Sequence, residues 1–253
     1  MNMVNVAVLG YGVVGSGVVE LIDKNNKLFT QKINQPIDVK YILDIRDFPG
    51  DKYEKKLVKD FNLILNDAEV SVVVETIGGA KIAYEFTKKA LLAGKNVVTS
   101  NKELVATKAP ELLAIAREKN VSYLFEGSVG GGIPIIRPLY HCLAANELKT
   151  IIGILNGTTN YILTKMVKEQ MPFDIALQNA QELGYAEKNP AADIEGHDTC
   201  RKICILASLA FGKHIYPQNV YTMGIQNIVL KDIEKAASKG YVIKLLGSAI
   251  KNE

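Results

Sequence analysis

The chain has 253 residues, 48% of them hydrophobic and 23% charged, and its 30 basic and 27 acidic side chains give a net charge of +3. This composition is ordinary for a globular protein, and the near balance of charge argues against a nucleic-acid partner. No apolar segment approaches the roughly 20 residues of a membrane span, so we expect no membrane partner. The length suits one large domain or two modest ones.

The chain has three cysteines, Cys142, Cys200 and Cys204, and their number indicates the redox state of the compartment in which the protein works. An odd and sparse number of thiols argues against a disulfide framework and indicates a reducing compartment, so we predict a cytoplasmic protein. Cys200 and Cys204 are four residues apart in a predicted helix. That spacing favours buried thiols over a metal site, because no set of four ligands surrounds it.

The first 22 residues predict a dinucleotide site. An apolar strand at residues 4–9 leads into a glycine turn, and residues 16–22 have helical period. In this context the first glycine allows a tight turn, the second lets the backbone approach a pyrophosphate, and the third packs helix on strand. The alternative is a glycine-rich turn without a ligand. The candidate cofactor-binding residues here are Gly10, Tyr11, Gly12, Val13, Val14 and Gly15.

A second strand, residues 37–43, ends beside Asp44 and Arg46. An acidic residue at this position usually binds the ribose hydroxyls of NAD, whereas a nearby arginine accommodates the 2′-phosphate of NADP. The sequence leaves the two cofactors open, with Arg46 favouring NADP slightly. Because the gap from Gly15 to Asp44 exceeds the usual spacing of about 20 residues, residues 21–35 are expected to add helix and loop.

Strands and helices continue to alternate as far as residue 132. Strands are predicted at 70–76, 96–100 and 121–125, with helices at 82–92 and 111–119. The alternation predicts an α/β domain over residues 1–132, a Rossmann-type doubly wound parallel sheet. Ligands bind outside the carboxyl ends of such strands. Thr76, Ser100 and Lys102 therefore become candidate cofactor-binding residues; the alternative for Lys102 is a surface lysine on a loop.

From residue 133 the alternation stops, so residues 133–253 are expected to form an α+β domain for substrate binding and dimerisation. Strands are predicted at 148–155 and 241–249, where 151–155 and 242–246 could pair across a two-fold axis. Thr158 or Thr159 is expected to cap a helix at 161–168. Further helices are predicted at 139–145, 173–183, 198–211 and 230–238.

The stretch from Gly184 to Lys202 concentrates charge at a loop–helix junction. Four carboxylates and a lysine stand there, and Asp198 and Lys202 lie four apart, on one face of the predicted helix. We interpret the stretch as a small-molecule site, against the alternative of a polar loop followed by a simple salt bridge. The four carboxylates are Glu187, Asp193, Glu195 and Asp198, and the lysine is Lys202.

The spacing Ala180-x3-Gly-Tyr-Ala-Glu-x2-Pro-x2-Asp-Ile-x-Gly-x-Asp-x3-Lys202 resembles the signature of the homoserine dehydrogenase family. Other segments are similar to that family and occur in its order along the chain. They are Gly10 to Gly15, Thr99-Ser-Asn-Lys102, Glu126-x-Ser-Val-Gly-Gly-Gly-Ile-Pro134 and Leu155-Asn-Gly-Thr-Thr-Asn-Tyr-Ile162.

The resemblance implies an oxidoreductase that interconverts L-homoserine and L-aspartate 4-semialdehyde with NAD(P), in threonine, methionine and isoleucine biosynthesis. Lys102 and Lys202 would be the catalytic residues, with Lys202 favoured as proton donor and Lys102 orienting substrate and cofactor. A lysine suits this work because it can act as acid or base and can polarise a carbonyl. Glu187, Asp193 and Asp198 would hold the substrate's ammonium group.

The apolar strands predicted at 151–155 and 242–246 lead us to expect a homodimer, and the resemblance also implies a monovalent cation. Glu126, with the carbonyls of Val129, Gly131 and Ile133, would bind that cation, usually sodium. Chains of the family usually continue beyond the point where this one stops, so we expect a C-terminal truncation.

Two rival interpretations differ in class. One is a non-catalytic NAD(P)-binding sensor or assembly module, which would have no use for two lysines and Glu187 together. The other is an aldehyde oxidoreductase that works through a thiol. The placement of the cysteines in predicted helices argues against the second.

Overall fold

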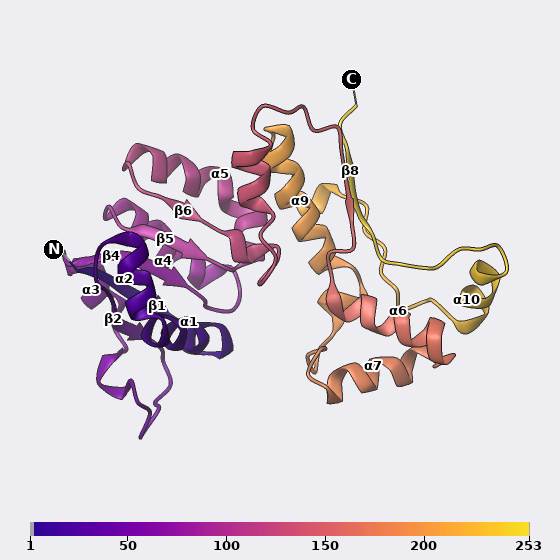
Figure 1. The fold of residues 1–253 in the computed structure, drawn as a ribbon, viewed down its shortest axis with the longest axis horizontal. Coiled ribbons are helices and arrows are strands. Elements are labelled where there is room, and N and C mark those ends of the chain that lie inside the picture. The colour runs from indigo at the N-terminus through magenta and orange to yellow at the C-terminus, as the bar shows by residue number, and fades with distance from the viewer. Residues whose placement is uncertain (1–2, 253) are drawn as a thin grey trace. The chain divides into compact units, whose positions relative to one another are not determined.

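The computed structural model describes residues 3–252. The chain divides into two compact units, Met1–Ile133 and Pro134–Glu253. In Figure 1 the first unit runs from indigo to magenta and the second from salmon to yellow. In the described part of the chain, no helix is both long enough and apolar enough to cross a membrane.

The first unit is built on a parallel sheet with the strand order β3-β2-β1-β4-β5-β6. The chain runs from β1 outward to β3 on one side and then returns to start β4 on the other side of β1. Ligands of doubly wound sheets bind at such a reversal. The predicted Rossmann-type sheet is thus confirmed, and its strands are β1 (Val4–Leu9), β2 (Ile37–Leu43), β3 (Leu57–Val58), β4 (Val70–Glu75), β5 (Asn96–Thr99) and β6 (Tyr123–Leu124).

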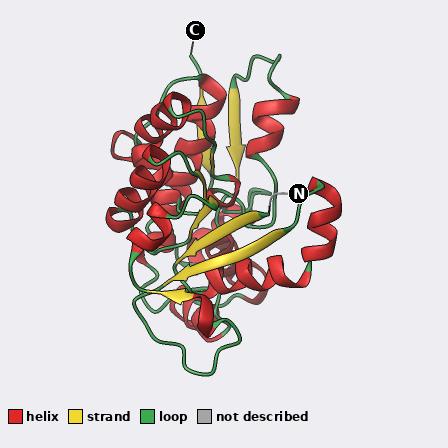
Figure 2. Ribbon diagram, turned by 90° about the vertical axis from the view of Figure 1, so that its left-hand side faces the viewer, coloured by secondary structure: helices red, strands yellow, loops and turns green. Residues whose placement is uncertain are grey.

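Helices connect these strands, except β2 to β3, because parallel neighbours need a crossover. Figures 1 and 2 show them packed around the sheet. The helix α2 is the extra element predicted between Gly15 and Asp44. The helices are α1 (Val13–Lys24), α2 (Asn26–Ile33), α3 (Phe61–Asn66), α4 (Lys81–Leu92) and α5 (Lys102–Glu118).

The core of this unit is formed by strands that are covered by helices on both faces of the sheet. Side chains on both faces of such strands are buried, so the sequences of β1 and β4 are nearly continuous hydrophobic runs. Val8 and Ile42 are fully buried, and Val6 and Val39 are nearly so. They pack with Val19 of α1, which is also fully buried. This packing of α1 against β1 and β2 fixes the position of the glycine turn that follows β1.

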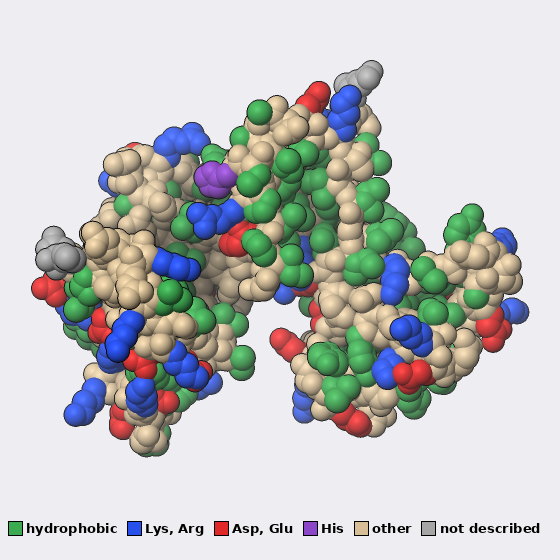
Figure 3. Space-filling model, in the orientation of Figure 1, with side chains coloured by type: hydrophobic (Ala, Val, Ile, Leu, Met, Phe, Trp, Pro, Cys, Tyr) green, Lys and Arg blue, Asp and Glu red, His purple; other side chains and the backbone are tan. Residues whose placement is uncertain are grey.

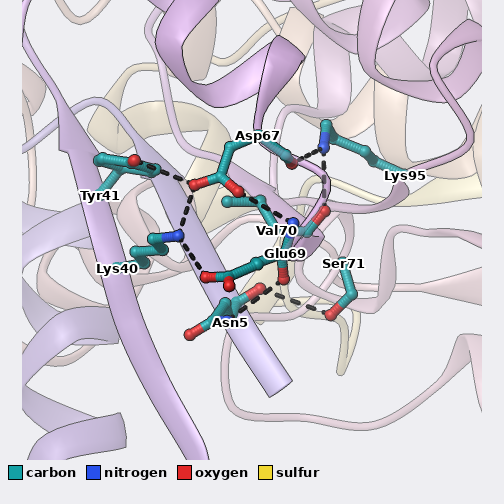
Figure 4. Close-up of polar contacts among 8 residues, drawn as sticks. All are labelled: Asn5, Lys40, Tyr41, Asp67, Glu69, Val70, Ser71 and Lys95. Atoms are coloured by element: carbon teal, nitrogen blue, oxygen red, sulfur yellow. Dashed lines mark hydrogen bonds and ion pairs between the residues drawn. The ribbon is translucent and has the colours of Figure 1, made fainter. Parts of the chain in front are cut away.

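A polar cluster at the opposite end of the sheet holds the strand starts together (Figure 4). The Lys95 ammonium, in a side chain only 4% exposed, donates to the carbonyl oxygens of Asp67 at 2.7 Å and Val70 at 3.0 Å. Lys40 pairs with Asp67 at 2.6 Å and with Glu69 at 2.7 Å. This cluster lies at the amino ends of β4 and β5, away from the edge where ligands bind.

The second unit combines helices with one antiparallel pair of strands, which confirms the α+β prediction. Ile151 of β7 faces Ala249 of β8, and Ile152 faces Ser248. In α6, Leu163 and Met166 are fully buried and belong to one cluster with Ala176 and Ala180 of α7. The elements are β7 (Thr150–Gly153), α6 (Gly157–Glu169), α7 (Phe173–Glu182), α8 (Ala191–Ile194), α9 (His197–Phe211), α10 (Leu230–Ala237) and β8 (Gly247–Ile250).

Three predictions for the second unit were wrong in detail. Residues 242–246, predicted as strand, precede β8 rather than forming part of it, so they cannot pair as a strand in this form. The helix predicted at 139–145 is a short π-helical turn, Pro138–Cys142. The cap of α6 is Asn156, whose side-chain oxygen accepts a hydrogen bond from the Thr159 amide. A threonine was expected there, but asparagine is an equally strong cap.

Candidate active site

The turn that joins β1 to α1 has glycine where a side chain would collide. Gly10 has a φ of +91°, and a Cβ there would lie 3.0 Å from the Thr76 carbonyl oxygen. A Cβ on Gly15 would lie 1.8 Å from the Gly10 carbonyl oxygen. Gly12, the N-cap of α1, would have nothing within 4 Å of its Cβ. The turn is therefore closely packed at Gly10 and Gly15 and open to solvent at Gly12, where the first N–H groups of α1 can bind a phosphate.

The other residues of this turn divide between its two sides. Val13 and Val14 are 92% and 53% exposed and so belong to the open side. Tyr11 is buried: its ring packs edge-on against Phe48 at 5.0 Å between centroids, and its hydroxyl donates to Asp51 at 3.2 Å. Burial and then this hydrogen bond raise the pKa of Tyr11 to about 12. The tyrosine side chain thus supports the turn as a neutral group.

Asp44, directly after β2, is engaged within the protein. It accepts the Tyr11 amide at 2.7 Å and a forked pair of bonds from Arg46, at 3.0 and 2.9 Å. The Arg46 guanidinium, assisted by backbone N–H groups, holds the pKa of Asp44 well below its usual range. The Asp44 side chain is 8% exposed and that of Arg46 is 57% exposed. Arg46 is therefore the member of the pair that solvent or a ligand reaches first.

The carboxyl ends of β4 and β5 position three predicted residues differently. The Thr76 hydroxyl faces the glycine turn, 2.9 Å from the Leu9 carbonyl oxygen and 3.0 Å from that of Gly10. Ser100 lies beside Gly127, whose Cβ would come within 3.3 Å of the Ser100 Cβ. Lys102 is half-buried at the first position of α5. The helix predicted at 111–119 starts earlier, at Lys102, because Pro110 lies inside α5 and does not end it.

The second unit brings three of its predicted residues into one hydrogen-bonded cluster, formed by Asn156, Asp193, Asp198 and Lys202. The Lys202 ammonium lies 2.9 Å from Asp198 and donates to the Leu155 carbonyl oxygen, also at 2.9 Å. The Asp198 side chain is 2% exposed and that of Lys202 is 16% exposed. The predicted contact one turn apart on α9 is thus a mostly buried ion pair, which water screens less than a surface pair.

Asn156 is the member that sequence reasoning missed. Its amide nitrogen donates to Asp193 at 2.7 Å and to Asp198 at 2.9 Å, while its side-chain oxygen accepts from the Thr159 amide at 2.8 Å. It is 5% exposed. One side chain therefore caps α6 and joins two carboxylates that would otherwise repel each other. The only sequence signal was an asparagine directly before the Gly-Thr-Thr that opens a helix.

The remaining carboxylates of the stretch lie outside this cluster. Glu187 is exposed on the loop after α7, where its backbone carbonyl accepts from the Gln181 amide at 3.1 Å. Glu195 pairs with His197 at 3.1 Å on the exposed start of α9. Gly196 between them has a φ of +86°, and a Cβ there would lie 3.2 Å from the Met223 carbonyl oxygen. Glycine at this position lets α9 start immediately before Asp198.

Glu126 begins a short 3-10 turn, Glu126–Ser128, and is half-buried. A Cβ on Gly130 would lie 2.8 Å from the Ile133 carbonyl oxygen, so the glycine-rich loop folds back closely on itself. Carboxylate and carbonyl oxygens are donors that suit a hard cation. Within residues 3–252 no group of three or more His, Cys, Asp or Glu side chains could hold a metal ion. A cation here would therefore depend mainly on backbone carbonyls.

The buried thiol of Cys204 is poorly suited to act as a nucleophile. Cys142 is exposed, whereas Cys200 and Cys204 are buried on α9, as predicted. Burial, followed by the neighbouring Cys200, raises the pKa of Cys204 to about 12. A thiol in this state does not supply the thiolate nucleophile that a covalent aldehyde mechanism needs.

The glycine turn at the reversal point of a parallel sheet gives the first unit the form of a dinucleotide-binding domain of the Rossmann class. Residues 10–126 match the family model described as the NAD binding domain of homoserine dehydrogenase. Residues 134–253 match the model described as homoserine dehydrogenase. The chain belongs to the homoserine dehydrogenase family, whose members are oxidoreductases.

Individual relatives agree with both models. A homoserine dehydrogenase of Bacillus subtilis (strain 168) is 40% identical over 253 residues, which cover 98% of this chain and 58% of the relative. The crystal structure of a putative homoserine dehydrogenase from Archaeoglobus fulgidus is 30% identical, with a TM-score of 0.89 and coverage of 98% and 81%. A hyperthermophilic archaeal homoserine dehydrogenase in complex with NADPH is 26% identical, with a TM-score of 0.80 and coverage of 98% and 79%. The chain thus spans little more than half the length of the curated relative.

Proposed function

We propose that this chain carries the site at which L-homoserine and L-aspartate 4-semialdehyde are interconverted with a nicotinamide cofactor. The observation that carries the proposal is the buried Asp198–Lys202 pair, 2.9 Å apart, in a cluster with Asp193. Family membership supports the substrate, and the open glycine turn supports the cofactor. The reaction would serve threonine, methionine and isoleucine biosynthesis in the cytoplasm, where free thiols such as Cys142 persist.

When bound, the nicotinamide supplies or accepts the hydride. In the direction of reduction, Lys202 would give a proton to the carbonyl oxygen of the semialdehyde as the hydride arrives at the carbonyl carbon. An ammonium has three N–H donors. Two of those of Lys202 are directed at Asp198 and at the Leu155 carbonyl, and we assign the third to the substrate oxygen.

The acidic residues are assigned by their contacts. Glu187, on the exposed loop, and Asp193, half-buried, would hold the ammonium group of the amino-acid substrate. Asp198 was expected to help in this, but its ion pair with Lys202 favours a role in orienting that lysine. Lys102 is proposed to contact substrate and cofactor, because it stands at the carboxyl end of β5.

We infer that the cofactor is NADP rather than NAD. Arg46 is the exposed partner of Asp44, and its guanidinium lies over the Phe48 ring at 5.0 Å. A planar guanidinium held in this way suits a 2′-phosphate. Calorimetry with NADPH and NADH tests this inference: Arg46→Ala should weaken NADPH binding far more than NADH binding. Equal losses for the two cofactors would contradict it.

We also propose a monovalent cation, sodium, at Glu126 with the carbonyls of Val129, Gly131 and Ile133. Support comes from the oxygen-only donor set and the close fold of the loop at Gly130.

A homodimer is proposed from the exposed face of the β7–β8 pair, where Ile152 and Ile250 are 59% and 64% exposed. Figure 3 shows hydrophobic side chains around these strands. Sedimentation of the chain at micromolar concentration tests the dimer, and a monomer throughout would contradict it.

The proposed activity is tested by following reduced-cofactor absorbance with aspartate semialdehyde, for the chain and for Lys202→Ala. A cofactor sensor without catalysis is not favoured, because the Asp198–Lys202 cluster would then have no task.

A further inference from the structure

The carboxyl edge of the first unit holds a buried carboxylate to which the proposed reaction assigns no role. Glu75, the last residue of β4, is fully buried, and Thr99, the last residue of β5, is 2% exposed. The Thr99 hydroxyl donates to one Glu75 oxygen at 2.6 Å, and the Ile77 amide donates to the other at 2.7 Å. Desolvation by burial raises the pKa of Glu75. Burying a carboxyl group costs free energy unless hydrogen bonds offset the loss of water, so a buried carboxyl group at this edge calls for a structural or functional explanation.

The hydrogen bonds continue from Thr99 into α5. The Asn101 amide donates to the Thr99 hydroxyl oxygen at 2.9 Å. The Asn101 side chain donates to the carbonyl oxygens of Ile77 at 3.2 Å and Gly79 at 2.8 Å. Its own oxygen accepts from the Leu104 amide at 3.0 Å and so caps α5.

These bonds form a closed ring that runs from Ile77 to Glu75, Thr99, Asn101 and back to Ile77, and we call it the strand-end clamp. It ties the segment after β4 to the segment after β5. Lys102, the next residue, begins α5 inside the capped turn. The clamp thus sets both the direction of α5 and the position of the segment 76–79, which lies beneath the glycine turn through Thr76.

We propose that Glu75 and Thr99 are positioning residues, which act through Asn101 and the strand ends to hold the nicotinamide-binding edge and Lys102 in place. The proposal rests on the proposed function, since it takes that edge to be where the cofactor binds. A carboxylate suits the task because both of its oxygens accept hydrogen bonds from groups on two different segments. Its burial makes the arrangement rigid, because loss of either donor leaves an unpaired buried oxygen.

Matched variants separate this role from general stability. Both Glu75→Gln and Thr99→Val keep the side-chain shape. Glu75→Gln replaces one of the two acceptor oxygens with an N–H donor, and Thr99→Val removes the hydroxyl, whereas Thr99→Ser keeps it. Lys95→Met is the control at the other end of β5, where an equally buried side chain makes two hydrogen bonds to backbone carbonyls. All are compared at a temperature at which circular dichroism shows them folded.

Calorimetric titration with NADPH should give a Kd raised about fivefold or more in Glu75→Gln and Thr99→Val. Thr99→Ser should restore the Kd of the unmodified chain. Lys95→Met should lower the melting temperature without changing Kd. Unchanged binding in Glu75→Gln and Thr99→Val, or equal weakening in Lys95→Met, would overturn the proposal. If Glu75→Gln does not fold, the Thr99→Val and Thr99→Ser pair decides it.

A second measurement does not depend on the ligand. Hydrogen exchange at the amides of Ile77, Asn101 and Leu104 should speed up in Thr99→Val and not in Lys95→Met. Equal exchange in the two variants would overturn the clamp itself. An unmodified chain that binds no NADPH but shows the predicted exchange would instead overturn the proposed cofactor site and leave the clamp standing.

Discussion

Asp198 and Lys202 form an ion pair of 2.9 Å, one turn apart on α9, with side chains only 2% and 16% exposed. A surface pair with this spacing would contribute a few tenths of a kcal/mol. A pair this buried is costly to desolvate and leaves a buried charge when either partner is removed. The surrounding cluster of Asn156, Asp193 and the Leu155 carbonyl is what makes the arrangement stable.

Replacing Asn156 should therefore damage both fold and site. Asn156→Ala removes a helix cap and two hydrogen bonds to carboxylates, so we expect the free energy of unfolding to fall by about 2–4 kcal/mol. The control is Asp60→Ala, which removes the cap of α3 in the other unit. Denaturant titration should show a smaller loss in the control, and homoserine binding should weaken only in Asn156→Ala. Equal homoserine binding in the two variants would contradict the role of Asn156.

Two glycines of α1 provide a test of the turn. In Gly15→Ala the new Cβ meets the Gly10 carbonyl oxygen at 1.8 Å, whereas at Gly17 nothing lies within 4 Å. Gly17→Ala should stabilise the chain by up to about 1 kcal/mol, the helix-propensity gain. Gly15→Ala should destabilise it by about 3 kcal/mol or more and abolish NADPH binding. Thermal melts and calorimetry measure both effects, and normal binding by Gly15→Ala would show that the turn is not the phosphate site.

The thiols should differ sharply in reactivity. Cys142 is exposed, while the pKa of Cys204 is raised to about 12 by burial and by Cys200. Titration with a disulfide reagent near neutral pH should modify Cys142 quickly and the other two only after unfolding. Cys142→Ser should abolish the fast phase without loss of activity. A fast phase that persists in Cys142→Ser would show that α9 opens readily.

Acid should weaken the polar cluster shown in Figure 4. The bond from Lys40, followed by the Glu69 amide, lowers the pKa of Asp67 from 3.8 to about 2. Because this pKa is depressed in the folded state, the stabilisation is complete above the unfolded value and is lost as the pH falls from about 4 to about 2. Asp67→Asn should show a flatter loss of stability over that range in denaturant titrations. An identical pH profile in Asp67→Asn would contradict the assignment.

The fold could be predicted where the period of the side chains was clear. The bounds of β1 and β2 followed directly from runs of apolar and β-branched residues. Two short elements, β3 and α3, were missed because they are too short to display a period. Residues 241–246 were predicted as strand because they are apolar, yet Tyr241 and Val242 are 69% and 68% exposed. Apolar composition alone does not tell an exposed segment from a strand.

Some contacts of the candidate site could likewise be predicted from the sequence, and others could not. The contact between Asp198 and Lys202 was predictable because helical geometry fixes residues four apart. The bonds from Asn156 to residues 37 and 42 positions later were not, because only tertiary folding brings those segments together. Glu75 had a signal that could have been used: a carboxylate at the end of an otherwise apolar run.

The most direct test is the rate of NADPH oxidation with aspartate semialdehyde, measured for the chain, for Lys202→Ala and for a control, Lys165→Ala. Lys165 is also paired with a carboxylate four residues away, Glu169, on a more exposed helix face. We predict turnover by the chain and by Lys165→Ala, and a loss of at least about 100-fold in Lys202→Ala, the scale of general acid catalysis. Equal rates with and without Lys202 would contradict its proposed role as the proton donor.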